Sequence, residues 1–193
     1  MKSFQTFNDV ISFWAGDAPN ASALFAQGQQ PLTYLGLSEI VLGFREFLSH
    51  AGFSRNDRIA IVHSGGADMA AAMTALACSV TVIPLNPAST IAEFYLHFQD
   101  KKINAIALED GLATNAREAA DKLNIPVLQI KVHSPEIAGN VYLSGEINTE
   151  TRIAPTAAEP DDLLVVFATS GTTGNGKTVP LSHRTMMPRL TNM

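Results

Sequence analysis

Residues 168–178 hold the densest group of chemically useful side chains in the sequence. They contain three glycines, four threonines, one serine and one lysine, directly after the apolar run at residues 163–167. Glycine lets the backbone turn tightly and expose N–H groups, hydroxyl groups donate hydrogen bonds to anionic oxygens or help to ligate magnesium, and lysine adds a positive charge. A strand that leads into such a loop predicts a polyphosphate-binding site rather than an ordinary polar turn.

One interpretation of this segment is a P-loop. Residues 171–178 match the Walker A pattern G-x-x-x-x-G-K-[ST] literally, which would bring Lys177 to the phosphates and Thr178 to magnesium. A helix must then begin at about Gly176, with Pro180 in its first turn, where proline is tolerated only near the start. After Thr178 the sequence offers no apolar strand that ends in aspartate, so a Walker B partner has no place downstream.

The other interpretation places a short extended segment at residues 178–181. Ser182 would then cap a helix that begins near His183, which explains the proline and the serine together. Pro188 is expected to shorten or kink that helix. Both interpretations predict a phosphate-binding loop, and they differ in whether a helix or a strand comes directly after it.

Strands alternate with helices in the residues before this loop. The alternation predicts an α/β fold with a mostly parallel sheet flanked by helices. Helices are expected near residues 7–16, 37–48, 69–80, 91–98 and 116–123, and strands at 58–63, 80–85, 103–108, 127–130 and 163–167.

Composition shifts suggest four sections of the chain. They are the N-terminal helices and a hairpin at about 1–54, βαβ layers at 55–130, a variable connection at 131–161, and a strand, phosphate loop and following helix at 162–193. The hairpin is expected from residues 22–25 and 32–34, with a turn between them. The connection is rich in proline, glycine, serine and threonine, and it holds at most one short strand, at residues 141–143.

The composition excludes several classes of protein. Hydrophobic residues make up 46% and charged residues 16% of the 193 residues, which supplies a globular core and excludes wholesale disorder. The formal net charge of −5 argues against binding of a nucleic-acid backbone, which needs clustered lysine and arginine. No stretch approaches the roughly 18 apolar residues of a membrane span. We therefore expect no nucleic-acid partner and no membrane span.

The single cysteine, Cys78, excludes a disulfide framework and a cysteine-based zinc site. A lone thiol on an alanine-rich helix is typical of a core residue in a reducing compartment. Residues 1–9 contain no apolar run of signal-peptide length. We expect a cytoplasmic protein, with organellar targeting at a missing C-terminus left open.

The histidines share no metal-ligand spacing, so the sequence predicts no metal site. His183 is expected to be a structural residue of a first helical turn, with a role near the phosphates as the alternative. The chain also offers no catalytic acid, base or nucleophile in a recognisable arrangement. The five histidines are His50, His63, His97, His133 and His183.

The loop and its surroundings resemble a known signature. Residues 169–174, followed by Lys177, Val179 and residues 181–183, resemble the phosphate-loop motif of the adenylate-forming enzymes (the ANL superfamily). This superfamily comprises acyl- and aryl-CoA synthetases, luciferases and the adenylation domains of peptide synthetases. Gly176 and Thr178 depart from the usual proline and glycine of the motif, and these two changes together create the Walker A match.

Three upstream segments carry the resemblance further, in consistent order. Residues 32–34 resemble the early "LTY" element, residues 56–61 the "GDRVAI" strand entry, and residues 84–87 the "PLNP" turn. The likeness extends over roughly residues 20 to 185. Residues 93–96 and 119–127 are most similar to CoA ligases of the oxalate–CoA ligase kind.

The resemblance implies the N-terminal part of the large domain of an adenylate-forming enzyme. Such an enzyme is an ATP-dependent acid–thiol ligase, which activates a carboxylate as an acyl-adenylate with release of pyrophosphate and passes the acyl group to a thiol. The implied small molecules are ATP, Mg²⁺, a carboxylate substrate and CoA as acceptor. The residues implied to bind the nucleotide are Thr169, Ser170, Thr172, Thr173 and Lys177 at the β- and γ-phosphates, with Gly171 and Gly174 allowing the backbone to close around them.

Members of the family are much longer than this chain. Their further residues carry the adenine pocket, the acidic magnesium ligand and a small C-terminal domain with a catalytic lysine. We therefore expect a fragment that lacks the remainder of its large domain and the C-terminal domain, and that is inactive alone. The alternatives are a P-loop NTPase, through the literal GTTGNGKT match, and a non-catalytic α/β binding module.

Overall fold

The computed structural model describes residues 3–146, 152–168 and 178–191, and its centre is a sheet of seven strands. The strands lie in the order β7, β6, β5, β3, β4, β8, β9. The inner strands run parallel, whereas β7 pairs antiparallel with β6 and β9 pairs antiparallel with β8. This arrangement confirms the predicted mostly parallel sheet. The bounds are β3 Arg58–Val62, β4 Thr81–Leu85, β5 Ala105–Glu109, β6 Val127–Val132, β7 Val141–Ser144, β8 Leu163–Ala168 and β9 Thr178–Ser182.

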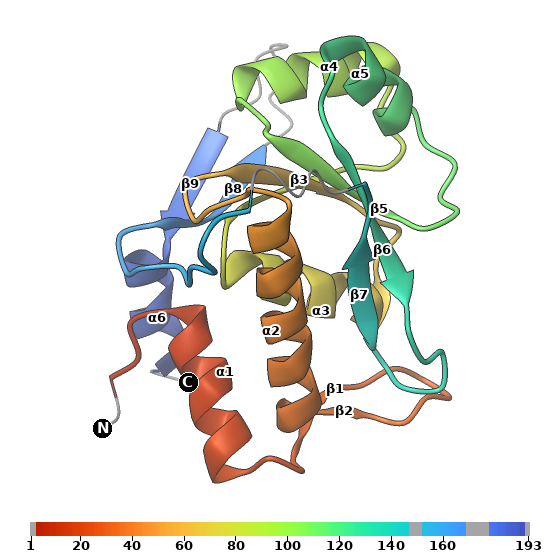
Figure 1. Cartoon of the computed structure of the whole chain (residues 1–193). Helices are drawn as coiled ribbons and strands as arrows, with labels where there is room; N and C mark the ends of the chain where they lie inside the picture. Colours follow the sequence, from red (N-terminus) through yellow and green to blue (C-terminus); the bar gives the residue numbers. More distant parts are fainter. Residues whose placement is uncertain (1–2, 147–151, 169–177, 192–193) are drawn as a thin grey trace.

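Helices cover both faces of this sheet (Figure 1). One apolar cluster joins the sheet to α1, α2 and α3, and a second joins the opposite face to α4 and α5. α6 follows β9 and lies beside α1 (Figure 1). The bounds are α1 Phe7–Asp17, α2 Tyr34–His50, α3 Gly66–Ala77, α4 Ile91–Asp100, α5 Ala116–Leu123 and α6 His183–Thr191.

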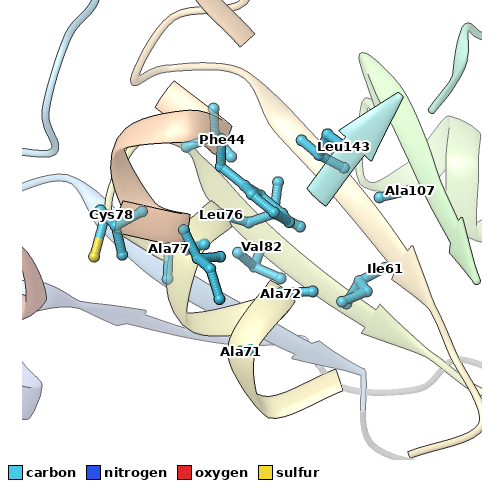
Figure 2. Close-up of a cluster of buried hydrophobic side chains, with 14 of the residues drawn as sticks. Phe44, Ile61, Ala71, Ala72, Leu76, Ala77, Cys78, Val82, Ala107 and Leu143 are labelled. Carbon is cyan, nitrogen blue, oxygen red and sulfur yellow. The ribbon is translucent and has the colours of Figure 1, made fainter. Parts of the chain in front are cut away.

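The central strands are buried on both faces, which explains their continuous apolar sequences. In β3, Ile59 and Ile61 belong to the cluster under α1–α3, and Ala60 and Val62 belong to the cluster under α4 and α5. All four side chains have 0% exposure. Figure 2 shows how Phe44, Leu76 and Val82, from α2, α3 and β4, meet in the first cluster.

A small hairpin precedes α2. β1 (Ser22–Leu24) pairs antiparallel with β2 (Leu32–Thr33). Tyr34 begins α2 instead of extending the second strand, because the Thr33 hydroxyl accepts the Gly36 N–H and caps the helix.

Residues 131–161, apart from the undescribed 147–151, include the end of one strand and the whole of another. Val132 still belongs to β6, and the short strand expected at 141–143 is present as β7. Gly139 has φ +71°, and a Cβ there would lie 2.9 Å from the Ala67 carbonyl oxygen, so only glycine fits this close approach to α3. The segment also forms an isolated bridge, Gln30↔Ile137, to the N-terminal hairpin.

Three helix ends differ from expectation. α1 runs past Gly16 to Asp17, because the Ala18 N–H still bonds to the Trp14 carbonyl. α3 ends at Ala77, so Val80 lies in the turn after it rather than on its apolar face. α6 contains Pro188 and continues to Thr191, so the proline does not end the helix, and a kink there stays a prediction.

A capping box starts α4: the Thr90 side chain accepts the Glu93 N–H, and the Glu93 carboxylate accepts the Thr90 N–H. In the described ranges, no helix combines the length and the apolar character that a membrane crossing requires.

Candidate functional site

β8 and β9 frame the segment predicted to bind phosphate. They pair antiparallel, and Ala168 at the end of β8 is the register partner of Thr178 at the start of β9. The segment therefore leaves the sheet at the carboxyl end of a parallel strand, which is the edge where open α/β sheets bind ligands. The predicted site residues Thr169, Ser170, Gly171, Thr172, Thr173, Gly174 and Lys177 lie outside the described residues.

The residues after this segment form a strand and then a helix. Thr178 to Ser182 are β9, and α6 begins at His183. The Ser182 Oγ atom accepts the Thr185 N–H at 3.2 Å, as an N-cap serine does. This confirms the predicted extended segment and its capping serine. The helix that the Walker A interpretation needs is not found over Thr178–Ser182.

Polar contacts fix the base of the β8–β9 hairpin. The Thr81 hydroxyl of β4 donates to the Leu163 carbonyl at 3.0 Å, and the His183 N–H donates to the Asp162 carbonyl at 3.1 Å. The Arg184 guanidinium binds the Asp161 carboxylate through Nε and Nη2, at 2.6 and 2.9 Å. This hydrogen bonding lowers the pKa of Asp161 and raises the pKa of Arg184. The start of β8 is therefore tied to both β4 and α6.

His183 is fully buried at the first turn of α6, as a structural residue would be. Its Nδ1 atom accepts the Phe7 N–H at 3.2 Å, so the ring connects α6 to α1. Burial lowers the pKa of His183, and the nearby Asp162 carboxylate opposes this effect in part. The ring is therefore neutral near pH 7.

A second polar cluster lies at the same edge of the sheet, after β3 and β5. The Ser64 N–H donates to Glu109 Oε2 at 2.6 Å, the His63 Nδ1 atom lies 3.3 Å from the same oxygen, and the Gly65 N–H donates to that Nδ1 at 3.1 Å. Desolvation raises the pKa of Glu109, but the hydrogen bonds from Ser64 outweigh it, so the pKa lies below its ordinary value. The cluster ties the turn before α3 to β5.

No sequence pattern indicates this pair, because Glu109 resembles a solvated acid at a strand end and His63 is distant from it in the chain. The adjacency of β3 and β5 brings the two together.

Cys78 is buried at the end of α3, and burial raises the pKa of its thiol to about 12. It is therefore a core residue with little thiolate at neutral pH, as predicted. In the part of the chain that the structure describes, no group of three or more histidine, cysteine or acidic side chains could hold a metal ion.

Comparison with known proteins gives relatives that include CoA ligases and a carrier-protein ligase. The chain is 27% identical over 192 residues to a probable CoA ligase of Humulus lupulus, which covers 97% of this chain and 36% of that protein. It is 31% identical over 159 residues to an L-proline–[L-prolyl-carrier protein] ligase of Pseudomonas fluorescens, a match that covers 80% of this chain and 30% of that protein. It is 27% identical over 196 residues to an oxalate–CoA ligase of Arabidopsis thaliana, a match that covers 97% of this chain and 37% of that protein. The chain thus spans about a third of the length of these relatives.

Solved structures share the fold. A long-chain-fatty-acid–CoA ligase from Archaeoglobus fulgidus superposes with a TM-score of 0.70 at 18% identity, over 95% of this chain and 38% of that one. A fatty acyl-adenylate ligase from L. pneumophila, solved in complex with acyl adenylate and pyrophosphate, superposes with a TM-score of 0.70 at 19% identity. The match covers 97% of this chain and 32% of that one. The family model described as AMP-binding enzyme matches residues 12–193. The chain therefore belongs to the AMP-binding enzyme family, the adenylate-forming enzymes that its motifs resemble.

Proposed function

We propose that this chain supplies the phosphate-binding part of an ATP-dependent acid–thiol ligase. The ligase joins a carboxylate to the α-phosphate of ATP, releases pyrophosphate, and passes the acyl group to a thiol, with CoA as the acceptor. The observation that carries the proposal is the order of elements around residues 169–177, in a chain of this family. A buried parallel strand enters the glycine- and threonine-rich segment, and an edge strand leaves it before a serine-capped helix begins.

The chemical difficulty of the first step is negative charge, because an anionic carboxylate attacks an anionic phosphate. In the proposal, the hydroxyls of Thr169, Ser170, Thr172 and Thr173 donate hydrogen bonds to the β- and γ-phosphate oxygens, and the Lys177 ammonium adds positive charge there. Gly171 and Gly174 let the backbone close around the phosphates. These groups stabilise pyrophosphate as it leaves and hold it in position. Bound Mg²⁺ would supply further charge neutralisation on the phosphates.

The proposed role of the chain is binding and orientation only. The proposal assigns no general base and no covalent nucleophile to residues 169–177, and the described residues contain no cluster of three or more metal-ligating side chains. The 193-residue chain with ATP, Mg²⁺, CoA and a panel of acids is therefore expected to release no pyrophosphate. Clear release by the chain alone would contradict this part of the proposal.

A chimera tests whether this chain can serve as the phosphate-binding part of an active ligase. The N-terminal third of the Arabidopsis oxalate–CoA ligase is replaced by this chain, and acid-dependent exchange of pyrophosphate into ATP is measured. Exchange with AMP as the product supports a ligase, whereas ADP formation independent of acid supports the P-loop hydrolase. Lys177→Ala in the chimera should abolish most of the exchange, and Lys122→Ala, an exposed lysine on α5, should not.

The relatives indicate which thiol and which acid to test first. The relatives include CoA ligases and a carrier-protein ligase, so CoA is the first acceptor thiol to test and a carrier-protein thiol is the alternative. The oxalate–CoA ligases among them make a short dicarboxylate the first acid to test in the chimera.

A further inference from the structure

His183 joins two parts of the chain that lie 176 residues apart in sequence. Its Nδ1 atom accepts the backbone N–H of Phe7 at 3.2 Å, and the two rings meet edge to face with their centroids 6.4 Å apart. Phe7 is the first residue of α1, and His183 is the first residue of α6, directly after β9. The N-terminal helix is thereby bonded to the residue that closes the β8–β9 hairpin, and Figure 1 shows α1 and α6 side by side.

This bond contributes to the cap of α1. The first N–H groups of a helix have no partner within the helix. In α1, the Thr6 hydroxyl accepts the Asp9 N–H at 3.2 Å, and the Asp9 carboxylate accepts the Thr6 N–H at 2.9 Å. This capping box does not use the Phe7 N–H, which donates instead to the His183 ring. The end of one helix thus depends on a side chain from the far end of the chain.

The bond also fixes where the ring carries its proton. A ring nitrogen that accepts a hydrogen bond has a free lone pair, so the proton of the neutral His183 ring lies on Nε2. Nε2 is buried and makes no well-formed hydrogen bond in the described part of the chain, although the Ala77 carbonyl interacts with the ring and raises the pKa of His183. Burying a polar atom without such a bond costs stability, and a phenylalanine would fill the same space without that cost. The bond to Phe7 is therefore the best-formed contact that an imidazole makes here and a phenylalanine cannot make.

A second proton on the ring would break this contact. It would occupy the Nδ1 lone pair and face the Phe7 N–H. Burial lowers the pKa of His183, while the Asp162 and Asp9 carboxylates and the Ala77 carbonyl oppose the change. The positive N-terminal ends of α1 and α6 also disfavour a cation between them. Acid conditions are therefore expected to open the contact between α1 and α6.

The position of β9 depends on contacts outside the sheet, such as the bond at His183, more than the position of β8 does. β8 pairs with β4 on one side and with β9 on the other, and Thr81 holds its first residue. β9 is an edge strand that pairs with β8 alone, and it passes directly into His183. An attachment at His183 therefore limits how far β9 can move relative to β8.

We propose that His183 is a positioning residue for the phosphate-binding segment. Its neutral ring bonds the end of the β8–β9 hairpin to α1, and so sets the position from which residues 169–177 meet a polyphosphate. The inference rests on the proposed function for its ligand, whereas the attachment between α1 and β9 can be measured without any ligand.

The first experiment compares two substitutions in the 193-residue chain. His183→Asn keeps an acceptor oxygen near the position of Nδ1 and does not titrate, whereas His183→Phe keeps an aromatic ring and removes the acceptor. Amide hydrogen exchange of Phe7 and of β9 is measured by NMR from about pH 5 to about pH 8. His97→Asn, at a half-buried histidine on α4, is the matched control.

We expect His183→Phe to speed exchange at Phe7 and β9 about tenfold or more, with β3 and β5 unchanged. His183→Asn should keep most of the protection. Protection in the wild-type chain should fall on acidification, and it should not do so in His183→Asn. Equal protection in all variants, equal loss in both His183 variants, or a wild-type profile that is flat with pH would each overturn the proposal.

The second experiment measures binding of magnesium pyrophosphate to the same proteins by calorimetry. Lys177→Ala should abolish binding, His183→Phe should weaken it about tenfold, and His183→Asn should bind like the wild type. If Lys177→Ala loses binding while both His183 variants bind normally, the positioning role is wrong and the proposed function stands. If the wild-type chain does not bind pyrophosphate, the proposed function fails for this segment, and the exchange experiment still decides the attachment.

Discussion

The centre of the sheet and its β8–β9 edge are held by different kinds of contact. In β3, four of the five residues are buried, and helices cover both faces of the strand. In β9, three of the five residues are exposed. The hairpin is fixed instead by directional polar contacts at its base, from Thr81, His183 and Arg184.

Apolar burial is strong but non-directional, so it stabilises the centre without setting the exact position of any one loop. Hydrogen bonds contribute less free energy each, but they fix distance and direction. We infer that the centre carries the stability of the fold, whereas the polar contacts set the position of the segment predicted to bind phosphate. Substitutions in the two regions should therefore differ in size and in kind.

The largest effect is expected in the centre. Ile61→Ala removes a side chain with 0% exposure from the cluster in Figure 2 and should lower the free energy of unfolding by about 2–5 kcal/mol. Val179→Ala on β9, where the side chain is 40% exposed, should cost less than about 0.5 kcal/mol. Denaturant unfolding of both variants measures the difference, and equal losses would contradict the division between centre and edge.

A smaller effect is expected at the cap of α1. Thr6→Ala removes the hydroxyl that accepts the Asp9 N–H and should cost about 1 kcal/mol. Because α1 anchors His183, amide exchange in β9 should also become faster. Thr90→Ala, which breaks the equivalent capping box of α4, is the control. If both variants changed β9 equally, the effect on β9 would reflect general loosening and not the anchor.

Acidification should weaken the fold through His183. Its folded pKa lies below the ordinary 6.5, so the unfolded chain takes up a proton first as the pH falls. The stability that the neutral His183 ring contributes is fully present above about pH 6.5. It is lost as the pH falls from there towards the lowered pKa of the folded chain. The free energy of unfolding is measured by chemical denaturation at pH values above about 5, because carboxylates become protonated and affect stability only at lower pH.

A control is needed because the pKa of His97 is also lowered, by burial and then by Lys101, which acts in the same direction. The acid loss should shrink in His183→Asn, and the remainder should disappear when His97→Asn is added. An unchanged acid loss in His183→Asn would show that the ring does not stay neutral in the folded chain.

Much of the fold could be predicted because its signals are local. The central strands are continuous apolar runs since both faces are buried, and the capping box at Thr90 needs only the spacing of two residues. The strand at residues 178–182 could be predicted because Pro180 and Ser182 fit an extended segment and a helix cap.

The rest depends on residues that the sequence keeps far apart. The pairing of His63 with Glu109 requires β3 and β5 to be neighbours, and the bond from Phe7 to His183 requires the first and last helices to meet. Neither pair has a periodic or motif signal. The assignment of residues 169–174 and Lys177 to phosphate binding stays a prediction from the resemblance, because these residues lie outside the described ranges.

The smallest effect is expected for the ion pair between Arg184 and Asp161. Both side chains are largely exposed, at 62% and 79%, so solvent and salt screen their attraction. Arg184→Lys keeps the charge but loses the bidentate geometry, so the unfolding free energy should hardly change. The geometry of the contact at the hairpin base should change instead. We expect amide exchange at residues 183–185 to become faster in this variant, and high salt should not produce the same change in the wild-type chain. If salt and Arg184→Lys had the same effect on exchange, this pair would act through charge alone, and directional positioning of the hairpin would fall to His183 and Thr81.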